Sequence, residues 1–380
     1  IKIRGQADMR IERIQPFLVG RSLLVRVYTD EGIVGTGEAG LWAHHPTVYR
    51  AVEELSAYYL GKDPTRMEHH FQVVSRNTHF MGSVLSAAMS AMDIAMWDIL
   101  GKAVNKPVHA LLGGKVRDKV RVFANVFGAT LDEFAESARQ QVAKGFTSLR
   151  TTPMFRDFEK ETPTKVIKDA VAIVGAIREA VGDEVDLGLE IHRNLTLNQA
   201  ILLAQELAPY RILYYEDPLP PESIEAIAYI ARHVDLPIAA GERSYNLQQF
   251  KTWIDSQAVA MVRPNLSLAG GFTQVKKIAA LAEAAFVGVF PHLMGSPVNI
   301  AAYTQFAAAT PNFVLMESFN ADTHPLNAIV DRPLTLEGGY ITVPEGPGIG
   351  LDIDESQLER FPYIEMGIRG NFAADGSVAH

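Results

Sequence analysis

Three short apolar runs each lead to an acidic residue: Leu187-Gly188-Leu189-Glu190, Ile212-Leu213-Tyr214-Tyr215-Glu216 and Ile238-Ala239-Ala240-Gly241-Glu242. The three glutamates are 26 residues apart both times, a span that fits one strand, one helix and two loops. If each run is a parallel strand, three consecutive strand ends direct carboxylates to one place. The spacing therefore predicts a repeating strand-helix fold with an acidic cluster at one end of its sheet.

The predicted acidic cluster needs a cation. Three carboxylates at close range repel one another strongly unless positive charge compensates them. An all-oxygen set suits a hard divalent ion, Mg²⁺ first. Glu190, Glu216 and Glu242 are therefore the candidate metal ligands.

Composition narrows the class of protein. The 380 residues suffice for one large domain and a smaller one. The net charge of −9, spread without long runs, argues against a nucleic-acid or anionic-membrane surface. The absence of cysteine excludes disulfides and thiolate metal sites. The most apolar stretch, Val84 to Leu100, has helical spacing and interior polar residues, so we expect a buried helix of a soluble, cytoplasmic protein.

From about Val120 the sequence alternates between strand and helix patterns. We expect eight strands at Val122–Val126, Phe146–Thr151, Asp186–Glu190, Ile212–Glu216, Pro237–Ala240, Val259–Val262, Val287–Phe290 and Phe313–Met316. Seven helices fill the gaps, at Leu131–Lys144, Thr164–Val181, Thr196–Ala208, Pro221–His233, Leu247–Trp253, Gly271–Ala284 and Pro297–Ala308. Eight such units favour an α/β fold with a closed, TIM-like barrel. A doubly wound open sheet is the alternative, weakened because no strand-to-helix turn carries G-x-G-x-x-G.

The two ends of the chain differ from this middle part. Residues 9 to 38 read as a meander of strands, followed by helices at Thr47–Leu60, Pro64–Arg76 and Ser83–Val104. The last forty residues are rich in turns and are expected to pack back on the N-terminal unit. We therefore predict an N-terminal α+β unit over 1–118, a barrel over 119–337, and a C-terminal segment, 338–380, that completes the first unit.

Chemistry in such barrels lies at the carboxyl ends of the strands. Residues there include Arg150, Thr151, Thr152, Glu190, His192, Glu216, Glu242, Arg263, Asn265, His292 and Glu317. His192 stands two residues after Glu190, and residues i and i+2 of a strand share a face, so both are expected in the mouth. His192 and His292 form a plausible acid and base pair because histidine titrates near neutrality. His44-His45 is either a solvated loop or a loop that folds over the mouth onto substrate.

Several motifs resemble a known family. They include Gly35-Thr36-Gly37-Glu38, Ala95-Met96-Trp97-Asp98, Glu216-Asp217-Pro218, Ala240-Gly241-Glu242, Leu266-Ser267-Leu268-Ala269-Gly270-Gly271 and Gly346-Pro347-Gly348-Ile349-Gly350. As a set, over nearly the whole chain, they resemble the mandelate racemase subgroup of the enolase superfamily, and most of all its galactonate dehydratases and related acid-sugar dehydratases. The resemblance implies a (β/α)7β barrel under an α+β capping domain made from both chain ends.

The resemblance also implies roles. Glu190, Glu216 and Glu242 match the ligands of one Mg²⁺ per subunit, which stabilises the charge that develops when a proton beside a carboxylate is removed. His292 matches the base that takes that proton, and His192 the acid that assists loss of the β-hydroxyl. Glu317 matches a carboxyl group that helps to bind the substrate carboxylate or enolate. Arg150, Thr152, His44 and His45 are candidate substrate-binding residues.

Three positions depart from the family pattern. Glu190 stands where the third-strand ligand is usually Asp. Asn265 replaces the sixth-strand Asp that pairs with the histidine, and an amide orients an imidazole without stabilising its charged form. Arg150 replaces a second-strand Lys, and arginine is a poor proton acceptor because its pKa lies above ~12.

The expected function is dehydration of a small-molecule sugar acid to a 2-keto-3-deoxy acid, by a protein that is a homo-oligomer as the family commonly is. Two alternatives stay open. One is an epimerase or lactone cycloisomerase that uses the same enolate. The other is a catalytically weak homologue that binds sugar acids, which Asn265 and Glu190 would mark.

Overall fold

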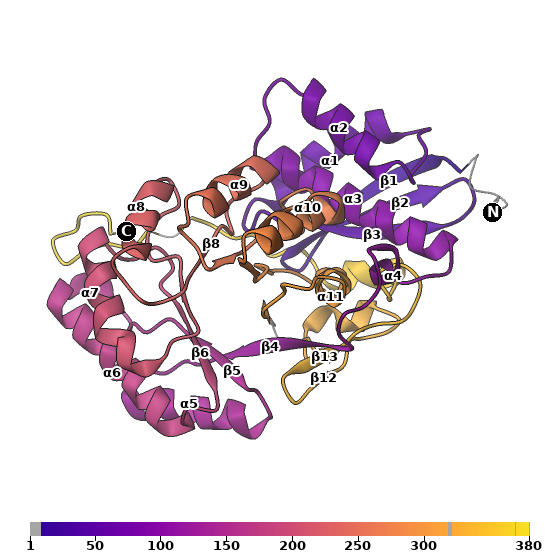
Figure 1. Cartoon of the computed structure of the whole chain (residues 1–380). Coiled ribbons are helices and arrows are strands. Elements are labelled where there is room, and N and C mark those ends of the chain that lie inside the picture. The colour runs from indigo at the N-terminus through magenta and orange to yellow at the C-terminus, as the bar shows by residue number, and fades with distance from the viewer. Residues whose placement is uncertain (1–8, 318–320, 369, 380) are drawn as a thin grey trace.

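The computed structural model describes residues 9–317, 321–368 and 370–379. It has two parts, a capping domain and a barrel, at the upper right and lower left of Figure 1. The strands of the cap form an antiparallel sheet in the order β1-β2-β3. The cap elements are β1 (Ile11–Val19), β2 (Ser22–Thr29), β3 (Val34–Ala39), α1 (His45–Tyr59), α2 (Met67–Asn77), α3 (Ser83–Ala103) and the short α4 (Val108–Leu111).

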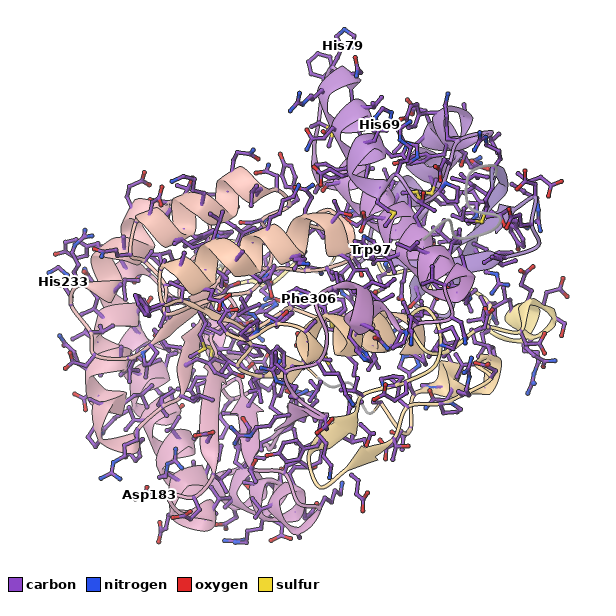
Figure 2. The ribbon with its side chains drawn as sticks, turned by 45° about the vertical axis from the view of Figure 1, so that its right-hand side comes forward. His69, His79, Trp97, Asp183, His233 and Phe306 are labelled. Carbon is purple, nitrogen blue, oxygen red and sulfur yellow. The ribbon has the colours of Figure 1, made fainter. Side chains whose placement is uncertain are left out.

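The longest helix of the cap, α3, packs directly on strand β3. Gly35 and Gly37 allow this approach, because a Cβ atom at either position would lie 2.0 Å from a carbonyl oxygen of α3. α3 is long and apolar enough to cross a membrane, but most of it is buried inside the protein, as expected of a core helix. Trp97 of α3 donates from Nε1 to Thr273 Oγ1 of the barrel at 2.9 Å. Figure 2 shows Trp97 at the junction of the two parts and Asp183 and His233 at the outer edge of the barrel.

The barrel follows the predicted alternation. Its strands are β4 (Lys119–Asn125), β5 (Ser148–Thr151), β6 (Asp186–Glu190), β7 (Tyr214–Glu216), β8 (Ile238–Ala240), β9 (Met261–Val262), β10 (Gly288–Val289) and β11 (Met316–Glu317). Its helices are α5 (Leu131–Ala143), α6 (Pro163–Val181), α7 (Leu197–Leu207), α8 (Ile224–Ala231), α9 (Leu247–Asp255), α10 (Gly271–Ala284) and α11 (Pro297–Ala308). The elements occur where they were expected, and several strands are shorter than predicted.

The barrel is closed. Neighbouring strands from β4 to β10 pair in parallel in chain order, and β11 pairs in parallel with β4. Phe313, just ahead of β11, bridges Val289 of β10 in parallel and completes the ring. The interior is filled by the side chains of Phe123, Tyr214, Ala239, Met261, Phe290 and Leu315. The prediction of a TIM-like barrel rather than an open sheet is therefore confirmed.

The C-terminal segment returns to both parts. β13 (Tyr340–Thr342) pairs antiparallel with β4 and with β12 (Leu336–Glu337). Buried Asp98 of α3 accepts from the backbone N–H groups of Thr36 and Ile349, each at 2.9 Å. Asp352 forms ion pairs with Arg26 and Lys102 of the cap. The segment is therefore tied to the cap as the sequence indicated. Four 3-10 turns complete the described structure, at Phe158–Lys160, Ala208–Tyr210, Pro325–Ile329 and Glu355–Arg360.

Candidate active site

The three spaced glutamates converge at the carboxyl ends of neighbouring strands. Glu190 and Glu216 end β6 and β7 and are direct partners in the parallel register. Glu242 lies two residues after β8, beyond Gly241, whose φ of +115° is a conformation that favours glycine. One carboxylate oxygen from each glutamate lies within 4.8 Å of the other two. The expected convergence of these side chains is thus present in the structure.

Burial and mutual repulsion perturb the three carboxylates. Burial, with the charge of Glu242 nearby, raises the pKa of Glu190 to about 7. Burial also raises the pKa of Glu216 well above its usual value, although Arg263 and Arg150 lie close. Burial alone would raise the pKa of Glu242 as well, but His292, Arg263 and Arg193 lower it to about 2. A site that holds these groups together favours a bound cation or bound protons.

Two arginines next to this cluster stack on aromatic rings of the barrel interior. The guanidinium carbon of Arg150 lies 4.5 Å from the ring centre of Phe123, and that of Arg263 lies 4.1 Å from the ring centre of Phe290. Arg150 Nη1 lies 2.8 Å from Glu317, and Arg263 Nε lies 2.7 Å from Glu216. Stacking on the ring faces therefore fixes both guanidinium groups against the carboxylates.

The ionisable side chains of the site carry more negative than positive formal charge. A third arginine, Arg193, pairs with Asp217 at 3.1 Å and with Glu242. Three guanidinium groups thus face five carboxylates, which leaves a formal charge of −2 with neutral histidines. The carboxylates are Glu190, Glu216, Asp217, Glu242 and Glu317. One divalent cation would balance that charge.

The donor set also fits such an ion. Both carboxylate oxygens of Glu216 are fully buried and accept no hydrogen bond among the described residues. Arg263 Nε is near one of them, but without the geometry of a hydrogen bond. Buried carboxylate oxygens without donors are costly unless a cation coordinates them. The residues present therefore suit a hard divalent metal held by Glu190, Glu216 and Glu242.

His292 follows β10 and is held by an amide. Its Nδ1 lies 3.0 Å from Asn265 Nδ2. The Asn265 Oδ1 atom accepts from the Tyr303 hydroxyl at 2.8 Å, and the Tyr303 oxygen accepts from the Ser267 N–H at 3.4 Å. This chain directs the amide N–H toward Nδ1 of His292, so Nδ1 accepts and Nε2 carries the proton. His292 Nε2 in turn lies 3.5 Å from Glu242.

His192 is placed by a turn rather than by a strand. β6 ends at Glu190, and His192 has a φ of +55°, so strand alternation does not place it, although Glu190 and His192 line the same cavity. Its backbone N–H donates to Glu190 Oε1 at 2.6 Å, and its Nε2 accepts from Arg193 Nη2 at 2.8 Å. Burial, together with the charge of Arg193, lowers the pKa of His192.

A cavity of about 850 Å³ lies between the barrel mouth and the cap, and many of these side chains line it, whereas Glu216 is buried and is not among its lining residues. The barrel contributes the expected Arg150, Thr152, Glu190, His192, Glu242, Asn265, His292 and Glu317. The cap contributes Leu41, Trp42, His44, Thr47, Ser83 and Val84, of which the sequence had indicated only His44. Glu317 accepts from the Leu293 N–H at 2.9 Å, and its pKa is lowered because Arg150, His292 and Arg263 outweigh its burial.

Several residues of this region differ from the sequence-based expectation, among them His45 and Arg193. His45 is not among the residues that line the cavity; it is buried in the first turn of α1, with its ring edge-on to Tyr363. Arg193 was not foreseen, although it directly follows His192 and pairs with two acidic residues of the cluster. A basic residue beside a predicted acid-base histidine was the signal available for it.

Comparisons with known proteins show the family of this chain. The family model described as "Mandelate racemase / muconate lactonizing enzyme, N-terminal domain" matches residues 18–113, and "Enolase C-terminal domain-like" matches residues 133–357. The chain belongs to the mandelate racemase and muconate lactonizing enzyme family of the enolase superfamily.

Individual relatives cover nearly the whole chain. A D-galactonate dehydratase from Ralstonia pickettii is 37% identical over 92% of this chain and 93% of its own length. One from Klebsiella pneumoniae is 35% identical over 95% of each. The crystal structure of an enolase from Agrobacterium radiobacter, bound to Na and L-malate, superposes with a TM-score of 0.91 at 30% identity and covers 97% of this chain and 99% of that one. A member of the enolase superfamily from Salmonella Typhimurium gives a TM-score of 0.89 at 30% identity, over 94% and 100%.

Proposed function

We propose that the protein is a Mg²⁺-dependent hydro-lyase that dehydrates a sugar acid to a 2-keto-3-deoxy acid. The observation that carries the proposal is the convergence of Glu190, Glu216 and Glu242, two of which, Glu190 and Glu242, line the same cavity as His192 and His292. The relatives named D-galactonate dehydratase support a sugar-acid substrate. A related structure that binds L-malate supports a hydroxycarboxylate ligand at such a site.

Glu190, Glu216 and Glu242 would hold the metal. When bound, Mg²⁺ supplies positive charge against the substrate carboxylate, where negative charge develops as the neighbouring C–H proton is lost. Arg150, with Nη1 2.8 Å from Glu317, is a permanent cation that binds a substrate carboxylate or hydroxyl group and does not accept protons. Thr152 and His44 line the same cavity and would contact the remaining hydroxyl groups of the substrate.

The histidines carry the proton transfers. His292 takes the proton α to the carboxylate at Nε2, and His192 protonates the β-hydroxyl, which leaves as water. The electron pair of the C–H bond becomes the C=C bond of an enol, which tautomerises to the keto acid. Since the Asn265 amide nitrogen faces Nδ1 of His292, acceptance of a proton at Nε2 requires the amide to rotate and present its oxygen to Nδ1. The lowered pKa of His192 makes its protonated form a stronger acid and a less populated one.

A second candidate function is favoured by that same amide orientation. A homologue that binds a sugar acid but removes its proton slowly would show this arrangement, because the amide stabilises the His292 tautomer that cannot accept at Nε2. Epimerisation through the same enolate needs a proton donor on the opposite face, and His192 is the only other histidine of the barrel that lines the described cavity.

A screen of sugar acids with Mg²⁺ tests the proposal. Formation of a 2-keto acid from at least one of them is the expected result. Exchange of the α-proton with deuterium and no keto acid would establish epimerisation in its place. Thermal stabilisation by a sugar acid with neither reaction would establish a binding protein.

A further inference from the structure

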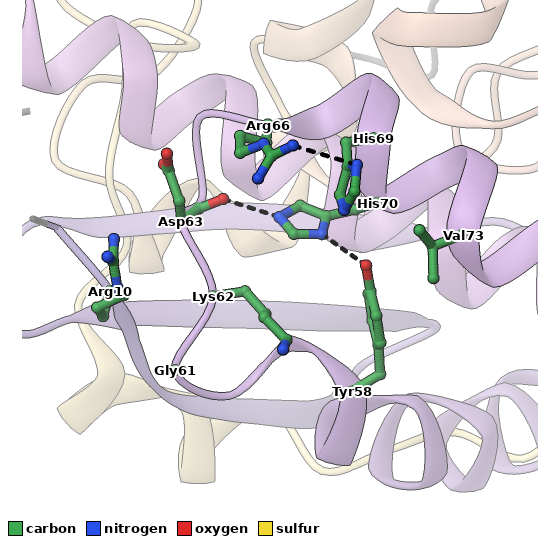
Figure 3. Close-up of a pocket in the computed structure, with 9 residues that line it drawn as sticks. All are labelled: Arg10, Tyr58, Gly61, Lys62, Asp63, Arg66, His69, His70 and Val73. Atoms are coloured by element: carbon green, nitrogen blue, oxygen red, sulfur yellow. Dashed lines mark hydrogen bonds between the residues drawn. The ribbon is translucent and has the colours of Figure 1, made fainter. Parts of the chain in front are cut away.

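The capping domain has a second hollow, with a volume of about 380 Å³, that shares no lining residue with the cavity at the barrel mouth. Figure 3 shows it between the start of β1, the end of α1 and the first turns of α2. Its lining includes three basic side chains, Arg10, Lys62 and Arg66, and one carboxylate, Asp63. Its formal charge is therefore +2 (three minus one), in a chain whose net charge is −9.

Backbone pairing holds two of these cations next to each other. Gly61 N–H donates to Ile11 O at 2.8 Å, and Ile11 N–H donates to Lys62 O at 2.9 Å. Gly61 has a φ of +72°, which lets the chain turn back onto the edge of β1. Arg10 and Lys62 flank this pair of hydrogen bonds, so the backbone keeps both residues in the lining of the hollow despite the repulsion between their charges.

The floor of the hollow is rigid and adds no charge. Buried His70 has both ring nitrogens in use (Figure 3): Nε2 donates to Asp63 O at 2.8 Å, and Nδ1 accepts from the Tyr58 hydroxyl at 3.0 Å. Burial also lowers the pKa of His70, which keeps the ring neutral. The His70 ring therefore links the loop before α2 to the end of α1 through two hydrogen bonds.

The three cations lack an acidic partner. Among the described parts of the chain, no carboxylate forms an ion pair with Arg10, Lys62 or Arg66, whereas exposed Lys165 and Lys251 each have one. Arg10 Nη1 donates to Met9 O, and Arg66 Nη2 lies 3.3 Å from His69 Nδ1. The Asp63 carboxylate is turned to Thr65, from which its Oδ1 accepts two hydrogen bonds at 2.8 and 2.7 Å.

We propose that this hollow binds a small molecule through a phosphate group. A phosphate monoester carries about −1.5 to −2 charge at pH 7, which matches the +2 of the lining. Two guanidinium groups and an ammonium group offer the charge-assisted hydrogen bonds that phosphate oxygens prefer. The hollow opens to solvent at Lys62 and Arg66, so a ligand of a few more atoms than phosphate can extend outward.

Calorimetric titration of the full chain with inorganic phosphate and with glycerol 3-phosphate tests this site. We expect both to bind, the ester more tightly, with affinity that falls as NaCl is raised. Arg66→Gln and Lys62→Gln should each weaken binding roughly tenfold, because each removes one charge-assisted hydrogen bond. Both positions are exposed, so the variants should keep the wild-type melting temperature.

Lys165→Gln and Lys251→Gln are matched controls, since each removes one exposed lysine elsewhere and should leave phosphate affinity unchanged. Absence of binding to the wild-type chain would overturn the proposal. So would equal binding to the wild type and to the Arg10→Gln/Lys62→Gln/Arg66→Gln triple variant, because phosphate would then occupy another place, such as the arginines at the barrel mouth.

Discussion

The side-chain amide of Asn265 points its nitrogen, not its oxygen, at Nδ1 of His292, over a distance of 3.0 Å. Tyr303 fixes this orientation, because its hydroxyl donates to Asn265 Oδ1 while its oxygen accepts from a backbone N–H. The histidine is thereby held as the tautomer with its proton on Nε2. A carboxylate in place of the amide would accept from Nδ1–H and leave Nε2 free to take a proton.

Asn265→Asp should therefore speed removal of the substrate α-proton. We expect the rate of deuterium exchange into a bound sugar acid to rise roughly tenfold or more, because a carboxylate selects the basic tautomer and stabilises the imidazolium. In the catalytic triad of serine proteases, the reverse change from Asp to Asn lowers kcat ~10⁴-fold. We therefore expect no larger rise than this. The measurement is exchange by NMR in D₂O with Mg²⁺, at matched substrate saturation. An unchanged rate would mean that the partner of Nδ1 does not limit this step.

Tyr303→Phe tests the effect of the Asn265 amide orientation separately from the effect of a negative charge at position 265. It removes the hydroxyl that fixes the amide, so Asn265 becomes free to rotate without gaining a negative charge. We expect a smaller rise in exchange than with Asn265→Asp, and a shift of the His292 ring ¹⁵N signals toward the tautomer protonated at Nδ1. An unchanged ¹⁵N spectrum in both variants would mean that this hydrogen-bond chain does not set the tautomer.

Much of the fold could be predicted because its signals are local. The eight barrel strands are short apolar runs that recur with intervening helical patterns, and chain order alone gives their parallel pairing. The convergence of Glu190, Glu216 and Glu242 could be predicted for the same reason, since each of them lies at or just after a strand end.

Other features of the site depend on contacts between distant residues and left no such pattern. The turn at His192, with its positive φ, breaks the alternation expected of a strand. The orientation of Asn265 depends on Tyr303, 38 residues away on α11. His45 belongs to the first turn of α1, and the expected helix began two residues too late to show that it is buried.

His292→Asn should stop α-proton exchange and leave ligand binding nearly intact. The asparagine keeps a polar side chain near Glu242 and Asn265 but has no nitrogen that accepts a proton at neutral pH. Exchange is followed by NMR, and binding by the ligand-induced rise in melting temperature. If exchange continues at the wild-type rate, another residue is the base.

Glu216→Gln should abolish tight binding of Mg²⁺. Glu216 is fully buried, and both its oxygens lack hydrogen-bond donors among the described residues, so an amide would place an N–H group where a cation needs an oxygen. We expect Mg²⁺ affinity to fall at least about 100-fold in calorimetry, along with the loss of keto-acid formation. Glu136→Gln, on the exposed face of α5, is the control that should bind as the wild type does. Wild-type affinity in Glu216→Gln would remove this residue from the ligand set.

We expect the free energy of unfolding to depend on pH through Asp93 of α3, which is not one of the candidate metal ligands. Its side chain is buried, Oδ1 accepts from the Thr273 N–H at 3.1 Å, and Oδ2 has no hydrogen-bond partner among the described residues. Burial raises its pKa from 3.8 to about 7. The folded state therefore holds the Asp93 proton more tightly than the unfolded state does.

Since this pKa is raised on folding, the contribution of Asp93 to stability is complete below about pH 4 and is lost as pH rises through 7. Asp93→Asn keeps an oxygen for the Thr273 N–H and cannot ionise, so its gain in stability over the wild type should be clearly larger at pH 8 than at pH 5, where only part of the Asp93 contribution has been lost. The expected difference at pH 8 is on the order of 1–4 kcal/mol, at about 1.4 kcal/mol per pKa unit. Urea unfolding at the two pH values measures it. A difference that does not change with pH would show that Asp93 stays ionised in the folded protein.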